Sequence, residues 1–136
     1  MASLFAWSEK YSVNIREIDS QHMKLIGMVA KLNEAMSKGK GREVLGGILK
    51  ELINYTASHF AAEERLMNLH GYPEYQEHKT KHDKMTGKVL DIQKQYEEGK
   101  ITITFEVMKF LEDWVDKHIL GTDMKYGPFL NSKGVR

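Results

Sequence analysis

Apolar residues recur every three or four positions through most of the chain, and this period constrains the fold more than any other feature. The spacing places apolar side chains on one face of an α-helix, and only two prolines interrupt the sequence. Four segments carry the pattern, at residues 19–37, 42–67, 74–98 and 103–119. Helices of this length joined by short turns favour an antiparallel up-down-up-down arrangement. The sequence therefore predicts an all-α four-helix bundle.

The two ends of the chain lack this period. Residues 1–18 contain apolar side chains without helical spacing, so we expect an irregular arm that packs across the bundle. We expect the first helix to begin near Asp19 or Ser20, because either side chain can cap free backbone N–H groups. After residue 119, Gly121 and Pro128 limit the chain to a short C-terminal turn or helix.

Gly46 and Gly47 interrupt the pattern of the second predicted helix. Each glycine inside a helix costs about 1 kcal/mol relative to alanine. Two alternatives follow from this cost. Either close packing against a neighbouring element requires the glycines, or the helix begins after them.

Length, charge and cysteine content exclude several classes of protein. A chain of 136 residues is expected to form one domain, residues 1–136. The formal net charge of +1 gives no basic footprint for nucleic acid. No apolar run approaches the roughly 20 residues of a membrane-spanning helix, and we recognise no secretory signal, so we expect a cytoplasmic protein. The absence of cysteine leaves histidine and carboxylate as the metal ligands available.

Five of the six histidines fall on the apolar stripes of the predicted helices, and this distribution is the most informative feature of the sequence. They are His22, His59, His78, His82 and His118. One such histidine alone is more often a hydrogen-bonded core residue. Here His59 lies four residues before Glu63, and His78 lies four before His82, so each pair projects from adjacent turns of one helix face and can chelate a metal ion. His70 lies in a turn and is expected to be exposed.

His118 and Asp123 form a less regular pair near the C-terminus. Five residues of α-helix rotate by about 500°, which leaves the two side chains about 140° apart. They cannot share a face of one continuous α-helix. Gly121 offers a place where the chain could leave the helix and return Asp123 toward the same centre. The alternative is a helix stop followed by a solvated aspartate.

The number of candidate ligands indicates the kind of metal site. Together with Glu63 and Asp123, the five histidines exceed what one tetrahedral zinc ion binds. If both carboxylates and one oxygen from water bridged two six-coordinate ions, all but one of the coordination places would be filled. Mixed imidazole and carboxylate ligands suit iron, manganese or zinc, and iron is the redox-active choice. The pattern therefore favours a metal pair with one open place for a small molecule.

Six motifs extend this pattern over nearly the whole chain. In order they are W-S-x-x-Y-S-V from Trp7, I-D-x-Q-H from Ile18, H-F-x-x-E-E from His59, G-Y-P-x-x-x-x-H-x-x-x-H from Gly71, W-x-x-x-H-I-x-x-x-D from Trp114, and Y-G-P from Tyr126. Their combined spacing resembles that of single-domain bacterial hemerythrins. This family binds dioxygen at a non-heme di-iron centre within a four-helix bundle.

The resemblance implies a role for each candidate residue. Two iron ions per chain are expected, bridged by an oxo or hydroxo group and by the carboxylates of Glu63 and Asp123. One iron takes His78, His82 and His118. The other takes His22 and His59 and keeps the open place for dioxygen. The apolar residues expected to wall that place are Phe60, Trp114, Val115 and Ile119, although core packing alone would account equally well for them.

The resemblance also implies a function, which we expect to be reversible dioxygen binding for carriage, storage or delivery rather than enzymatic catalysis. Dioxygen is the expected partner, and protein partners stay open. Two alternatives remain: an oxygen or redox sensor module, and a di-iron enzyme acting on peroxide or nitric oxide. Ferritin-like enzymes use Glu-x-x-His pairs and carboxylate-rich sites, whereas this chain has His-x-x-x-His, which favours the oxygen-binding function.

Overall fold

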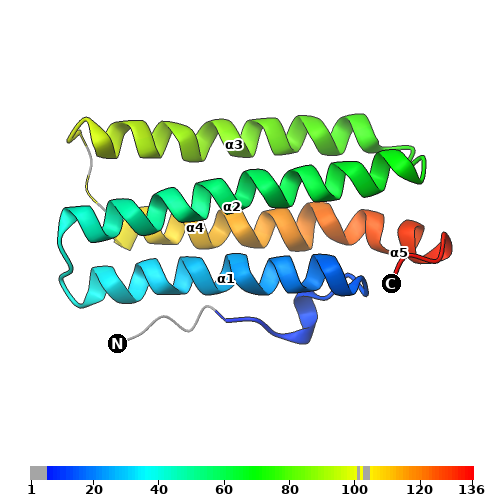
Figure 1. Cartoon of the computed structure of the whole chain (residues 1–136), viewed down its shortest axis with the longest axis horizontal. Helices are drawn as coiled ribbons and strands as arrows, with labels where there is room; N and C mark the ends of the chain where they lie inside the picture. The colour runs from blue at the N-terminus through cyan, green and yellow to red at the C-terminus, as the bar shows by residue number, and fades with distance from the viewer. Residues whose placement is uncertain (1–5, 101, 103–104) are drawn as a thin grey trace.

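Four long helices form an antiparallel bundle, as the sequence predicts (Figure 1). The computed structural model describes residues 6–100, 102 and 105–136, without the side chain of residue 105. The long helices are α1 (Arg16–Ser37), α2 (Arg42–Leu69), α3 (Tyr75–Glu97) and α4 (Phe105–Asp116). Helix α1 packs on α2 and α4, and α2 packs on α3. The predicted start of the fourth helix, at residue 103, lies outside the described residues.

Helix α1 begins earlier than predicted, at Arg16, with Ile15 as its N-cap. The expectation that Asp19 or Ser20 caps this helix is therefore wrong. The Asp19 carboxylate instead accepts hydrogen bonds from the arm, from Ser12 Oγ at 2.6 Å and from the Val13 backbone N–H at 2.8 Å. Asp19 thus fixes the turn that leads into the helix from a position within its first turn.

Helix α2 continues through both glycines, and packing explains the first of them. A Cβ atom at Gly46 would lie 3.1 Å from Cε2 of Tyr96 on α3. The Tyr96 hydroxyl donates a hydrogen bond of 2.6 Å to the Arg42 carbonyl, which joins the start of α2 to the end of α3. Close packing, the first of the two alternatives, is confirmed at Gly46. A Cβ at Gly47 would meet no atom within 4 Å.

The chain does not leave the helix at Gly121, which corrects the predicted helix end at residue 119. Helix α4 continues as a π-helical segment, η2 (Lys117–Asp123), and then as a short helix, α5 (Met124–Ser132). A π-helix closes its backbone bonds from residue i to residue i+5 and is typical of functional sites. The predicted short C-terminal helix is therefore present, as a direct extension of α4.

The N-terminal arm packs across the bundle, as expected. It contains a short 3-10 turn, η1 (Glu9–Tyr11), and the Tyr11 hydroxyl donates a hydrogen bond of 2.7 Å to Asp116 on α4. A Cβ at Gly127 of α5 would lie 3.1 Å from the Val13 carbonyl oxygen, so the glycine permits this close approach. The arm, α5 and the end of α2 share one apolar cluster, and a larger one fills the rest of the bundle.

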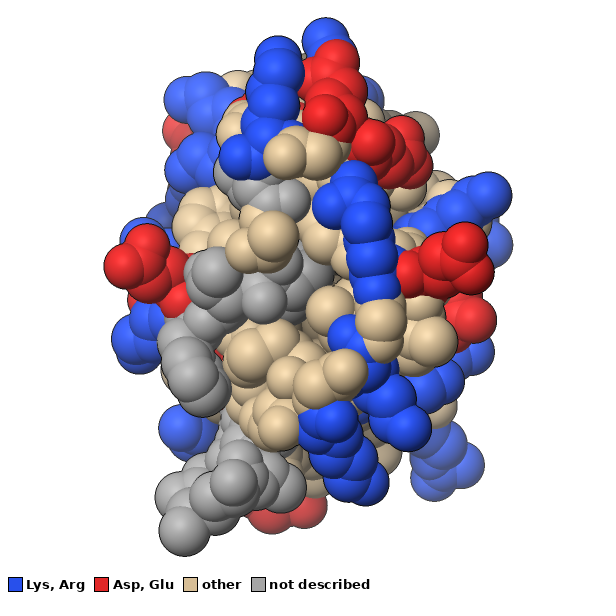
Figure 2. Space-filling view, turned by 90° about the vertical axis from the view of Figure 1, so that its left-hand side faces the viewer, with Lys and Arg blue, Asp and Glu red and all other residues tan. Residues whose placement is uncertain are grey.

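Figure 2 shows the end with the α1–α2 and α3–α4 connections, where lysine and arginine side chains, with acidic ones among them, lie around a group of uncharged residues. The candidate ligands lie toward the other end, since they come from the first part of α1 and α3, the last part of α2, and η2. None of the described helices is long and apolar enough to cross a membrane.

Candidate metal centre

The seven predicted ligands meet in the interior of the bundle, and each is at most 4% exposed. Their nitrogen and oxygen atoms form two groups, within each of which all atoms lie within 4.8 Å of one another. The first group is His22, His59, Glu63, His118 and Asp123, and the second is Glu63, His78, His82 and Asp123. Both carboxylates belong to both groups. A pair of bridged metal ions requires this sharing.

Asp123 lies close to histidines from three different elements. Its Oδ2 atom is 2.7 Å from Nε2 of His22 and 2.8 Å from Nε2 of His118. Its other oxygen, Oδ1, lies 3.0 Å from Nε2 of His78. One carboxylate therefore reaches toward both groups with separate oxygens.

Glu63 is surrounded in a similar way. Its Oε1 atom lies 3.2 Å from Nε2 of His59, 3.2 Å from Nε2 of His82 and 3.1 Å from Nε2 of His118. The geometry thus places His118 with His22 and His59, whereas the family resemblance assigns it to the iron of the other two histidines. How the histidines divide between two metals stays a prediction.

Three polar residues with no role assigned from the sequence form hydrogen bonds to the candidate ligands. The Nδ1 of His59 donates a 2.6 Å hydrogen bond to Gln21 Oε1, and the Nδ1 of His82 donates one of 2.9 Å to Glu64 Oε2. The buried Tyr126 hydroxyl donates to Glu63 Oε2. Such bonds fix the imidazole tautomer and leave Nε2 free for a metal. Gln21 and Glu64 are sequence neighbours of candidate ligands, and Tyr126 lies three residues after Asp123. All three belong to the motifs, but their spacing does not indicate a hydrogen-bonding role.

The two carboxyl groups have opposite pKa shifts. Burial alone raises the pKa of both groups, since it disfavours a charge. In Glu63 the neighbouring His59 and His118 outweigh burial, and the pKa lies well below its ordinary value. In Asp123 burial and the charge of Glu63 together hold the pKa well above it. A cation between the two groups would relieve their repulsion.

Burial and neighbouring carboxylates also shift the pKa values of three histidines. Desolvation lowers the pKa of His59 well below its ordinary value and that of His78 to about 3. For His22, the bonds to Asp123 and Glu63 outweigh burial and raise the pKa. Neutral imidazoles are the form that binds metals. His59 and His78 are therefore held ready to act as ligands at neutral pH.

The chemistry of these donors fits bound metal ions, and iron is one of the metals that they suit. Six buried atoms of the seven clustered residues lack a hydrogen-bond partner: His22 Nδ1, His118 Nδ1, Glu63 Oε1, His78 Nε2, His82 Nε2 and Asp123 Oδ1. The last four belong to side chains of the second donor group. Buried polar atoms without partners are rare in proteins and call for an explanation such as a bound ion. Mixed imidazole and carboxylate donors suit iron, manganese or zinc. The unpaired atoms and the shared carboxylates together support a metal centre.

The four predicted pocket residues are all buried, and Phe60 packs directly against the candidate ligands. The Phe60 ring stacks on the His82 ring, with centroids 3.9 Å apart and an interplanar angle of 2°. Its centroid lies 4.8 Å from that of His118 and 6.3 Å from that of Trp114. Val115 and Ile119 are 0% exposed and belong to the main apolar cluster. The side of the cluster at Phe60 is therefore apolar.

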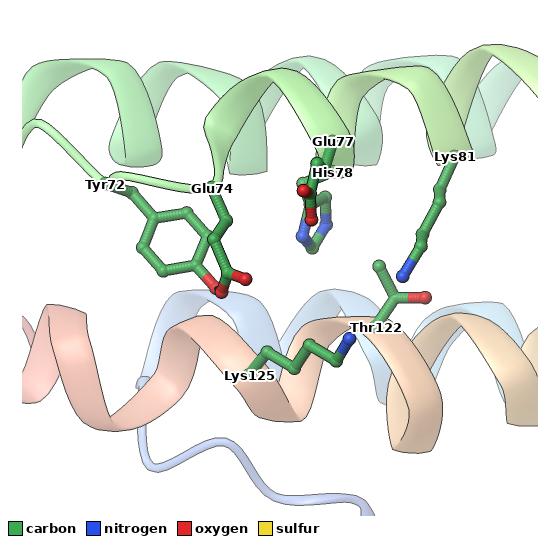
Figure 3. Close-up of a pocket in the computed structure, with 7 residues that line it drawn as sticks. All are labelled: Tyr72, Glu74, Glu77, His78, Lys81, Thr122 and Lys125. Carbon is green, nitrogen blue, oxygen red and sulfur yellow. The ribbon is translucent and has the colours of Figure 1, made fainter.

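A small hollow lies between α3 and the η2–α5 helix, with His78 among its lining residues (Figure 3). Its volume is about 10 Å³, close to the space of a single water. The side chains of Lys81 and Lys125 extend toward Thr122 at its floor. His78 is 4% exposed, more than any other member of the cluster. The expectation that His70 is exposed is wrong, because this residue is half-buried at the C-cap of α2; it belongs to neither group of candidate ligands.

Comparison with known proteins points in the same direction as the geometry. The sequence profile of a family described as the hemerythrin HHE cation binding domain matches residues 13–130. A bacteriohemerythrin of Methylococcus capsulatus is 34% identical over 131 residues, covering 96% of this chain and 99% of the relative. One of Stenotrophomonas maltophilia is 33% identical, covering 91% and 80%. A crystal structure of wild-type hemerythrin superposes with a TM-score of 0.88 at 34% identity, covering 94% and 98%.

Proposed function

Because the chain belongs to the hemerythrin family, we propose that it binds dioxygen reversibly at a non-heme di-iron centre and serves in oxygen carriage, storage or delivery. One observation carries the proposal. Glu63 and Asp123 each belong to both groups of buried donor atoms, as carboxylates that bridge two metal ions would. The family's fold and its oxygen-binding character support the same reading.

The proposed ligands are the seven clustered side chains. Glu63 and Asp123 would bridge the ions, and the five histidines would bind through Nε2. When bound, the iron pair supplies two electrons and an open coordination place for dioxygen. Gln21 and Glu64 hold the rings of His59 and His82 through their Nδ1 atoms. Tyr126 holds one oxygen of Glu63, so the bridging carboxylate has a fixed orientation.

Reversible binding requires a dry site, because water or an acid beside bound oxygen promotes its release as a reduced product. Phe60, Trp114, Val115 and Ile119 are buried apolar or aromatic residues. The one polar atom of Trp114, Nε1, donates a 3.2 Å hydrogen bond to the Met85 carbonyl oxygen, so this N–H group already has a partner on α3. We propose that these side chains exclude water and proton donors from the oxygen-binding side of the centre.

The decisive experiment is an oxygen cycle on the purified protein. The protein is reduced without oxygen, titrated with dioxygen and then deoxygenated, while visible absorption is recorded and iron per chain is measured. We expect two irons per chain and a spectrum that appears with oxygen and disappears on its removal. Consumption of oxygen without recovery of the reduced form would contradict the carrier function and favour the enzyme alternative.

A further inference from the structure

Trp114 lies at the floor of a surface hollow between α3 and α4. The hollow has a volume of about 160 Å³, and its lining residues are Met85, Lys88, Phe110, Asp113, Trp114 and Lys117. Trp114 is 5% exposed, and the hydrogen bond from its Nε1 to the Met85 carbonyl fixes the indole across the gap.

Aromatic rings connect this hollow to the candidate metal centre without interruption. The Trp114 ring centroid lies 6.3 Å from that of Phe60. Phe60 in turn stacks on His82 at 3.9 Å and lies 4.8 Å from His118. Electron tunnelling weakens steeply with distance through protein, and a path along packed rings is short. The chain thus holds a direct route from its surface to two of the proposed ligands.

The rim of the hollow has an excess of positive charge. Lys88 and Lys117 are exposed on its two sides and form no ion pair within the described part of the chain. Lys84, also exposed, lies one helical turn before Lys88. The single acidic residue of the lining, Asp113, is already paired with Lys109 at 3.2 Å. An acidic surface is the complementary partner.

The size of the hollow indicates how such a partner would fit. Sites that bury a small molecule usually have volumes of about 300–1,000 Å³. A hollow of about 160 Å³ is too small for a whole redox cofactor. It suits one protruding side chain, or the exposed edge of a prosthetic group carried by another protein.

We propose that this hollow is the docking site for a small acidic electron-transfer protein that reduces the di-iron centre through Trp114 and Phe60. The inference rests on the proposed function, since a ferrous oxygen binder that has oxidised must be reduced before it binds oxygen again. Two donor molecules each lose one electron, and the two ferric ions each gain one. No bond to a protein atom forms or breaks.

Docking is tested with both proteins oxidised, so that no electron moves. An acidic plant-type [2Fe–2S] ferredoxin is titrated into the diferric protein at low ionic strength by calorimetry. We expect the double variant Lys88→Glu/Lys117→Glu to weaken binding by about tenfold or more, with the difference lost at high salt. The matched control is Lys31→Glu/Lys50→Glu, with the same charge change at exposed positions of α1 and α2. Equal weakening in both double variants would overturn the docking site.

The electron path is tested by stopped-flow reduction at saturating ferredoxin. At saturation the rate of reduction no longer depends on affinity, so Trp114→Leu should slow reduction by about tenfold whatever its effect on binding, and Trp114→Phe, which retains a ring, should recover most of the rate. Trp7→Leu, on the arm, serves as the control. Equal rates in all of these variants at equal iron loading would overturn the path. Absence of iron in the parent protein would instead refute the proposed function, while the titration would still report on docking.

Discussion

The side chains of His118 and Asp123 meet at 2.8 Å, between Nε2 and Oδ2, although five residues separate them. On an α-helix they would point about 140° apart. The π-helical segment Lys117–Asp123 removes this conflict, because its wider turn stacks residues five apart on one face. Thr122 Oγ1 supports the segment with a 3.2 Å hydrogen bond to the Lys117 carbonyl oxygen. A local change of helix type therefore brings the last carboxylate into the centre.

Replacement of Asp123 by asparagine should cost the protein at least one iron per chain. The amide keeps the shape of the side chain but loses the negative charge that a bridging ligand supplies. Elemental analysis of iron per chain is the measurement. Asp113→Asn, which makes the same change on the exposed side of α4, should retain full iron. Equal iron in both variants would argue against Asp123 as a ligand.

Substitution of individual histidines should distinguish those that bind iron from those that do not. His78→Ala and His82→Ala should lose iron and lower the free energy of unfolding by about 2 kcal/mol or more, because metal bound to the native state stabilises it. His70→Ala should leave both quantities near those of the parent, since His70 lies outside both groups of donors. Iron analysis and urea unfolding test this. A similar loss in all three variants would contradict the assignment.

Removal of the Tyr126 hydroxyl should loosen the metal centre without abolishing it. Partners that orient metal ligands contribute about 10–100-fold to metal affinity. We expect Tyr126→Phe to release iron to a competing chelator about tenfold faster than the parent, because Glu63 loses a hydrogen bond. Tyr75→Phe, at a half-buried position on α3, is the control. Identical release from both variants would mean that Tyr126 only packs.

Ile119 should control how long the oxygenated protein survives. The residue is 0% exposed and directly follows His118, one of the proposed ligands. Ile119→Glu should put a carboxylate near the open place and block oxygen binding or speed autoxidation, and Ile119→Ala should speed autoxidation by admitting water. Leu120→Ala, at a 39% exposed position, should change neither. The spectral decay of the oxygenated form at matched iron content is the measurement, and unchanged decay in both Ile119 variants would place this residue outside the pocket.

Alkaline pH should destabilise the fold through its tyrosines. Burial, with a hydrogen bond to Asp116, raises the pKa of Tyr11, and burial, with one to Glu74, raises that of Tyr72 to about 12. Unfolded tyrosines ionise near pH 10, so above that pH the native state holds more protons and its stability falls as the pH rises. Urea midpoints measured from about pH 9 to about pH 11 should therefore decrease. Tyr11→Phe should show a shallower decrease, and an equal slope would contradict the role of Tyr11.

The sequence by itself determined the helical fold and the inward position of the histidines. A period of three to four residues is a property of neighbouring positions, so it can be read without knowledge of the fold. The same holds for His59 with Glu63 and for His78 with His82, whose spacing guarantees a shared face on any α-helix. All of these side chains are buried in the structure.

Only the tertiary structure decided which distant groups meet and where local geometry departs from the α-helix. Asp19 is a residue type that often caps helices, but here its carboxylate accepts a hydrogen bond from the backbone of the N-terminal arm instead. Glu63 and Tyr126 are 63 positions apart, and no periodicity relates them. The π-helical segment places the side chains of Asp123 and His118 on the same side of the helix. Such contacts depend on packing between elements, because backbone propensity acts over a few residues whereas packing joins positions that the chain order keeps far apart.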